Sequence, residues 1–200
     1  MKILLFANRV IEPVHSMTGI GRYVKELTLG IIAANKSSRW TYDLCAPGEG
    51  RQPGWLPADM GYRRVPGPRK LVHAAWTAIG APRLERLVGT FDLIHALHPS
   101  YPIPTGGPAM ITLHDLLPLR HPEWYRRDEN LGFRRTLDVV GERGWGVIVN
   151  SEYVGRQVRE LGTISPDRIS VVHMAVGDEF RHPVDAVHVS AACASLGLTP

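Results

Sequence analysis

Short apolar runs alternate with amphipathic segments along most of the chain. The apolar runs are typical of buried strands, and they lie at residues 1–7, 40–46, 62–65, 91–96, 109–113, 146–149 and 169–172. The amphipathic segments carry apolar residues at the spacing of one helix face, and they lie at residues 20–31, 71–88, 131–142 and 152–161. The second helix is expected to be interrupted at Gly80 and Pro82, and Ser151 is expected to cap the last one.

This alternation predicts the fold class. It favours an α/β fold with a Rossmann-like, doubly wound and mainly parallel sheet of about seven strands, covered by helices on both faces. In open sheets of this kind, ligands bind beyond the carboxyl ends of the strands. Functional residues are therefore expected in the loops that follow Ala7, Ala96, Leu113 and Val149.

The composition narrows the class of protein without selecting a function. The 200 residues are 44% hydrophobic and 21% charged, which suits a folded domain and not a disordered chain. The formal net charge of +4 favours an anionic partner such as a nucleotide, a phosphate or an anionic lipid surface, and nucleic acid is not expected as a partner. The two cysteines lie far apart, and no secretory signal or membrane-spanning stretch is visible, so a cytoplasmic location is expected.

Two glycines stand where a loop enters the first predicted helix. Gly19 and Gly21 would let the backbone approach an anion, whose charge is favoured by the free N–H groups and the helix dipole. They would equally permit a tight turn with no ligand. The segment has neither the G-x-G-x-x-G pattern of nicotinamide enzymes directly after the first strand nor the Gly-Lys-Ser/Thr of a P-loop.

Histidines gather at two neighbouring strand ends. His98, His114 and Asp115 could converge on a zinc or iron ion. His95 and His98, however, would point to opposite faces of an alternating strand, so no metal site is expected. His114 ends a buried strand, which places its imidazole in a cleft, and Asp115 could orient a ring or cap the next segment. His95 and His121 are interpreted as structural histidines.

Four blocks of sequence resemble the retaining glycosyltransferases of family 4. They are residues 18–23 (TGIGRY), 111–116 (ITLHDL) continuing to 120–125 (RHPEWY), 147–152 (VIVNSE) and 165–172 (SPDRISVV). Each block is unspecific alone, but the four follow one another in the family's order over most of residues 1–181. The resemblance implies a GT-B architecture, in which two Rossmann-like domains face each other across a cleft. The N-terminal domain of such enzymes mainly holds the acceptor.

The resemblance also implies roles for individual residues. The donor diphosphate would contact the start of the first helix, at Gly19, Gly21 and Arg22. The catalytic residues would be His114 and Asp115. The acceptor would contact three residues at the strand ends and in the loop between them: His98, Tyr101 and Ser151.

The implied reaction is the transfer of a hexose, such as mannose or glucose, to a glycan or lipid-linked acceptor with retention of anomeric configuration. The donor is a nucleotide-diphosphate sugar, which acts as a co-substrate. Neither a cofactor nor a metal is implied, because helix N-termini and basic side chains neutralise the leaving diphosphate. A role in polysaccharide biosynthesis and peripheral association with the inner face of the membrane are also expected.

The resemblance divides the chain unequally. Residues 1–182 are predicted to form the N-terminal, acceptor-side domain, and residues 183–200 a linker or the start of a C-terminal nucleotide-sugar-binding domain. After Val172 the sequence departs from the family's usual Pro-x-Gly-Val-Asp type of turn. The donor-binding residues of the family lie in that second domain, so this half is expected to be inactive alone. Two alternatives stay open: a non-catalytic nucleotide- or sugar-binding module, and a metal-dependent hydrolase that uses the histidine cluster.

Overall fold

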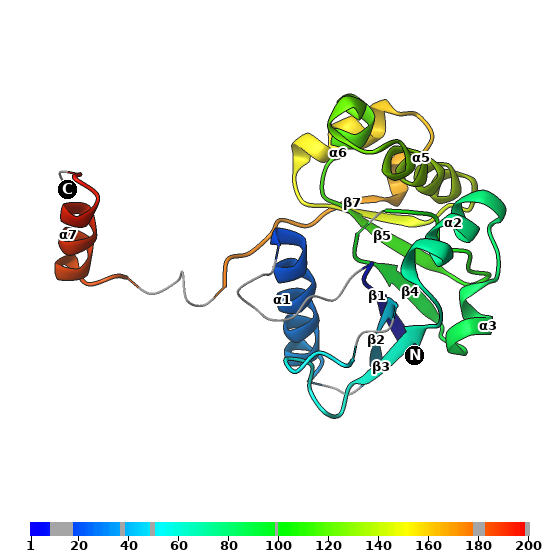
Figure 1. The fold of residues 1–200 in the computed structure, drawn as a ribbon, viewed down its shortest axis with the longest axis horizontal. Coiled ribbons are helices and arrows are strands. Elements are labelled where there is room, and N and C mark those ends of the chain that lie inside the picture. Colours follow the sequence, from blue (N-terminus) through cyan, green and yellow to red (C-terminus); the bar gives the residue numbers. More distant parts are fainter. Residues whose placement is uncertain (9–17, 37–38, 49–50, 99, 178–182, 199–200) are drawn as a thin grey trace.

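The computed structural model describes residues 1–8, 18–36, 39–48, 51–98, 100–177 and 183–198. Within these residues lies a sheet of seven parallel strands in the order β3-β2-β1-β4-β5-β6-β7 (Figure 1). The strands are β1 (Lys2–Phe6), β2 (Thr41–Pro47), β3 (Gly61–Val65), β4 (Leu93–Ala96), β5 (Ala109–Leu113), β6 (Gly146–Val149) and β7 (Ile169–Val171). All seven overlap the predicted apolar runs, which confirms the α/β, Rossmann-like sheet.

Helices cover both faces of this sheet (Figure 1). One face carries α1 (Gly19–Ala34), and the other carries α2 (Arg69–Ile79), α3 (Leu84–Val88), α5 (Arg127–Glu142) and α6 (Glu152–Glu160). The apolar pattern does not predict α4 (Leu117–Arg120) or the 3-10 turn Pro122–Trp124, because elements this short show no helical periodicity. The apolar pattern also places the start of α5 four residues too late. The first turn of α5 is stabilised by the Glu129 side chain, which accepts a hydrogen bond from the Arg126 N–H, and not by apolar packing.

The side chains of β1 alternate between two hydrophobic cores. Leu4 and Phe6 are fully buried against residues of α2, α3 and α5. Ile3 and Leu5 point to the opposite face, where they pack with Val24 of α1. A strand that is buried on both faces reads as a continuous apolar run, which is why the central strands can be located from sequence.

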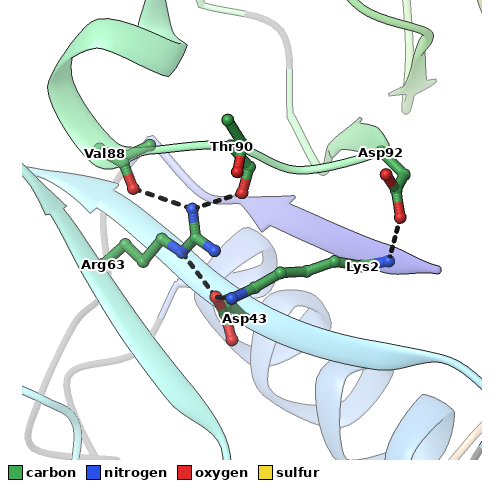
Figure 2. A network of polar contacts seen from close by, with 6 residues as sticks. All are labelled: Lys2, Asp43, Arg63, Val88, Thr90 and Asp92. Atoms are coloured by element: carbon green, nitrogen blue, oxygen red, sulfur yellow. Dashed lines mark hydrogen bonds and ion pairs between the residues drawn. The ribbon is translucent and has the colours of Figure 1, made fainter.

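A network of charged groups ties three strands together at the amino end of the sheet (Figure 2). Asp43 of β2 is buried, and its Oδ2 lies 3.1 Å from Lys2 Nζ and 2.5 Å from Arg63 Nε. Arg63 of β3 also donates from Nη1 to the carbonyl oxygens of Val88, at 2.8 Å, and Thr90, at 3.0 Å. The network therefore joins β1, β2 and β3 to the connection between α3 and β4.

The last described segment contains α7 (Ala186–Ser195), which lies apart from the sheet in Figure 1. The residues at 183–198 are exposed, except for Cys193, which is half-buried. The predicted boundary between residues 182 and 183 adjoins a segment outside the described residues, so the division into two parts stays a prediction. Of the helices in the described ranges, none is long and apolar enough to cross a membrane.

Candidate active site

A pocket of about 210 Å³ opens at the carboxyl ends of β4 and β5. It lies where a parallel sheet of this kind is expected to hold its ligand. The loop after β4, the end of β5, and the starts of α4 and α5 supply its walls. The residues that line it are His98, Ser100, His114, Asp115, Pro118, Tyr125, Glu129 and Phe133. The structure thus brings together three of the predicted site residues.

The imidazole of His114 is held in a defined chemical state. Its Nε2 lies 3.1 Å from the carbonyl oxygen of Leu97. A carbonyl can only accept a hydrogen bond, so Nε2 carries a proton, and in the neutral ring Nδ1 is left as the acceptor. Burial lowers the pKa of His114, against smaller opposing contributions from the Leu97 carbonyl and Asp115. The neutral form, with a lone pair on Nδ1, is therefore favoured at neutral pH.

His98 lies beside His114, with ring centroids 6.0 Å apart. Burial lowers the pKa of His98 to about 4. Among the described residues, no hydrogen-bond partner reaches its buried Nδ1. The loop that carries His98 is fixed by Asn8, whose side-chain amide donates to the His98 carbonyl at 2.8 Å and to Ser100 Oγ at 2.6 Å. Asn8 lies two residues after β1, and its position near a strand's carboxyl end could have suggested this role from sequence.

Asp115 both lines the pocket and starts the next element. Its Oδ1 accepts a hydrogen bond from the N–H of Leu117, the first residue of α4, at 2.9 Å, while Leu116 is the N-cap itself. The bond holds the start of the next segment, which agrees with one of the two roles expected for Asp115. The opposite wall comes from Glu129 and Phe133 of α5 and from Tyr125, which lies two residues before that helix, and none of the three is among the predicted site residues. Gly132 lets α5 approach this closely, because a Cβ there would collide with the Ser100 carbonyl oxygen.

Two predicted acceptor residues lie outside the pocket lining. Tyr101 is only 2% exposed, and its ring packs against Trp76 and His73 of α2. Ser151 is the N-cap of α6, where its hydroxyl accepts from the Val154 N–H at 3.3 Å. Tyr101 therefore supports the pocket loop from within the core, and Ser151 has the capping role that was expected. Contact of either residue with an acceptor stays a prediction.

The predicted diphosphate site lies at the start of α1. Thr18 caps this helix by accepting from the Gly21 N–H at 3.2 Å. Gly19 is exposed, and no described atom lies within 4 Å of the position that a Cβ would take there, so the backbone can be approached closely. Gly21 is buried and Arg22 is exposed. Tyr23, in the same turn, contacts His114, which brings the start of α1 to the edge of the sheet where the pocket opens.

The two histidines that were predicted to be structural have partners within the protein. His95 is buried, and its Nε2 lies 2.8 Å from Thr112 Oγ1. His121 stacks on Trp124 and lies 3.2 Å from a carboxylate oxygen of Glu123. Both contacts agree with the structural roles predicted for these residues. In the described part of the chain, no group of three or more His, Cys, Asp or Glu side chains is arranged to hold a metal ion.

The buried histidines predict a loss of stability in acid. Burial lowers the pKa of both His95 and His98 to about 4, so only the unfolded chain takes up these protons between about pH 6.5 and pH 4. The free energy of unfolding should fall across that window by a few kcal/mol, since each pKa unit corresponds to about 1.4 kcal/mol. Urea denaturation at pH 7 and pH 4.5 measures this. His95→Gln should remove part of the difference, and an unchanged difference in this variant would show that other groups cause it.

A parallel sheet with a pocket at its carboxyl edge defines an α/β domain of the ligand-binding Rossmann-like class. The sequence profile of Glycosyltransferase Family 4 matches residues 17–180. The chain therefore belongs to glycosyltransferase family 4.

Two solved structures are similar to the chain. A glycosyltransferase from Rickettsia africae ESF-5 is 14% identical, with 100% of this chain and 50% of that chain covered at a TM-score of 0.49. Anabaena Alr3699/HepE, solved in complex with UDP, is 17% identical, with 98% of this chain and 50% of that chain covered at a TM-score of 0.51, and it shows the shared fold. The chain thus spans about half the length of both proteins. None of the curated proteins compared with the chain matches it.

Proposed function

We propose that this chain is the acceptor-side domain of a retaining glycosyltransferase, which transfers a hexose from a nucleotide-diphosphate sugar to a glycan or lipid-linked acceptor. The observation that carries the proposal is the pocket shared by His98, His114 and Asp115 at the carboxyl edge of the sheet, in a chain of glycosyltransferase family 4. UDP bound to the Anabaena protein supports a nucleotide sugar as the donor. Mannose and glucose are the hexoses that we expect.

His114 is the residue that we place at the reacting centre. Its Nδ1 can accept a hydrogen bond from a sugar hydroxyl, because Nε2 is already committed to Leu97. The bond between the anomeric carbon and the diphosphate oxygen breaks as the bond to the acceptor oxygen forms on the same face of the sugar. The acceptor proton passes to the departing diphosphate oxygen. Asp115 contributes negative charge close to the anomeric carbon, where positive charge develops.

The start of α1 supplies the complementary charge. The positive end of the α1 dipole, the exposed backbone of Gly19 and the Arg22 guanidinium stabilise the negative charge that grows on the leaving diphosphate, while the buried Gly21 N–H donates to the Thr18 cap and lets the helix start there. This arrangement needs neither a metal nor a cofactor. It needs a second domain to hold the nucleotide, because the donor must reach α1 from across the cleft.

The acceptor is proposed to enter between His98 and the wall made by α5. Tyr125 offers an aromatic face, and Glu129 offers a carboxylate that can accept from sugar hydroxyls. Tyr101 and Ser151 would act at the margin of this site. Trp124 and Leu131, which are close in sequence to the lining residues Tyr125 and Glu129, are exposed apolar side chains, and such side chains suit a peripheral position at the membrane that would present a lipid-linked acceptor. Location on the inner, cytoplasmic face belongs to the same proposal.

The test compares the chain alone with the chain joined to a family C-terminal donor domain. Nucleoside diphosphate release from UDP- and GDP-hexoses is expected only from the joined protein, with the anomeric configuration of the product read by proton NMR. Turnover by the purified 200-residue chain alone would contradict the proposal that a second domain is needed for activity, and an inverted product would contradict retention. Metal analysis of the purified chain distinguishes the hydrolase alternative from the other two, because only the hydrolase requires a bound metal ion. Binding of sugar or nucleotide without turnover by the joined protein would favour the non-catalytic module.

A further inference from the structure

Tyr23 joins the start of α1 to the strand end that carries His114. It is half-buried and lies two residues after Gly21. Its ring meets the His114 imidazole edge to face, with centroids 4.5 Å apart and planes at 86°. Aromatic groups prefer this geometry because the positive edge of one ring meets the negative face of the other. The contact therefore favours one tilt of the imidazole.

The hydroxyl of Tyr23 is itself anchored in the sheet. It donates to Thr112 Oγ1 at 3.3 Å, and Thr112 Oγ1 lies 2.8 Å from His95 Nε2. Thr112 and His95 are both buried. When Thr112 accepts from Tyr23, its own proton can be donated to His95 Nε2, so that every group in the series is satisfied. The position of the Tyr23 ring is thus set by β5 and β4 as well as by its own helix.

His114 is consequently held from two directions. The Leu97 carbonyl accepts from Nε2, and the Tyr23 ring packs against the imidazole. Rotation of the imidazole by half a turn would exchange its nitrogen and carbon positions. The Leu97 carbonyl would then lose its donor, and the ring would meet Tyr23 differently. A single orientation satisfies both neighbours.

We propose that Tyr23 is a positioning residue of the site: it holds the His114 imidazole in the orientation in which Nε2 donates to Leu97 and Nδ1 is left to accept from a substrate hydroxyl. The last step, contact with substrate, rests on the proposed function. Because Tyr23 shares a turn with Gly19 and Gly21, the start of α1 and the orientation of His114 are set together.

The test reads the tautomer of His114 by imidazole ¹⁵N NMR in the 200-residue chain at neutral pH. His114→Gln removes one set of signals and so assigns them. The parent chain should show His114 with its proton on Nε2. Tyr23→Leu should shift the two nitrogen signals toward the average of both tautomers, and Tyr23→Phe, which keeps the ring, should give a smaller shift. The matched control is Tyr42→Leu, at a half-buried tyrosine that packs in the core on the α1 side, and it should leave His114 unchanged.

An unchanged His114 signal in folded Tyr23→Leu would overturn the proposal and leave Tyr23 as a packing residue. If Tyr23→Leu does not fold, Tyr23→Phe and Thr112→Val carry the test, because each removes one partner of the anchoring bond and keeps the tyrosine or phenylalanine ring. No shift in either would also overturn it. The NMR readout does not depend on turnover. If Tyr23→Leu shifts the His114 tautomer but leaves the turnover of the joined protein unchanged, the positioning by Tyr23 is supported. The proposed catalytic role of His114 is then contradicted.

Discussion

Replacement of Asp43 by alanine is expected to lower the free energy of unfolding by about 3–5 kcal/mol, because removal of one partner from a buried ion pair leaves the other charge uncompensated. Asp43 is 9% exposed, and the Arg63 side chain that would lose its partner is 16% exposed. Arg63 would keep its bonds to the carbonyl oxygens of Val88 and Thr90, but these groups carry no opposite charge. Urea denaturation of the purified chain measures the change.

The control for this variant is Asp92→Ala. Asp92 is exposed, and its Oδ2 accepts from the backbone N–H of Lys2 at 2.6 Å, so it belongs to the same network without being buried (Figure 2). Its removal should cost about 1 kcal/mol or less. The double variant Asp43→Leu with Arg63→Met should recover much of the stability, because it removes both charges and keeps the volume apolar. Equal effects of Asp43→Ala and Asp92→Ala would show that burial does not strengthen this network.

The strands could be predicted from sequence because the apolar pattern that marks each strand lies within its own run of residues. A parallel strand that is buried on both faces consists of consecutive apolar residues, as in β1, so its own residues are enough to locate it. The interruption at Gly80 and Pro82 could be predicted in the same way, because both residue types end helices, and it separates α2 from α3. A short element such as α4 depends on single contacts, such as the bond from the Leu117 N–H to Asp115, and hydrophobic periodicity cannot predict such contacts.

The side of the pocket that the sheet supplies could be predicted for a related reason. His98, His114 and Asp115 follow strand ends, and parallel strands bring their carboxyl ends to one edge. The α5 wall depends on how closely that helix approaches the loop after β4, and this is set by a tertiary contact between Gly132 and the Ser100 backbone.

The burial of Tyr101 could not be predicted from sequence. It lies in a proline-rich loop, and loops usually lie at the surface. The chain instead turns inward at this point, and the aromatic ring is covered by α2. The periodicity of the sequence carries no information on this turn, because it arises from packing between segments far apart in the chain.

Loss of the His114 imidazole is expected to have a large effect on catalysis and a small one on folding. In the domain joined to a donor domain, His114→Ala should reduce turnover by roughly a hundredfold or more, as does removal of a positioned polar group from a reacting centre. The same change should lower the free energy of unfolding by only about 1 kcal/mol, since His114 is half-buried and the main loss is its bond to the Leu97 carbonyl. Steady-state kinetics and thermal melting of the same preparation measure both quantities.

His121→Ala is the matched control for this variant, because it removes a second histidine from the same stretch of chain outside the pocket lining. It should leave turnover within about twofold of the parent, as is usual for a surface substitution. His114→Gln gives a further comparison: its side-chain amide can still donate to Leu97, but its acceptor oxygen does not take the position of the imidazole Nδ1. Stability should therefore return toward the parent value in His114→Gln while turnover stays low. A His114→Ala protein that is clearly destabilised but transfers sugar at the parent rate per folded molecule would instead make His114 a structural histidine, like His95.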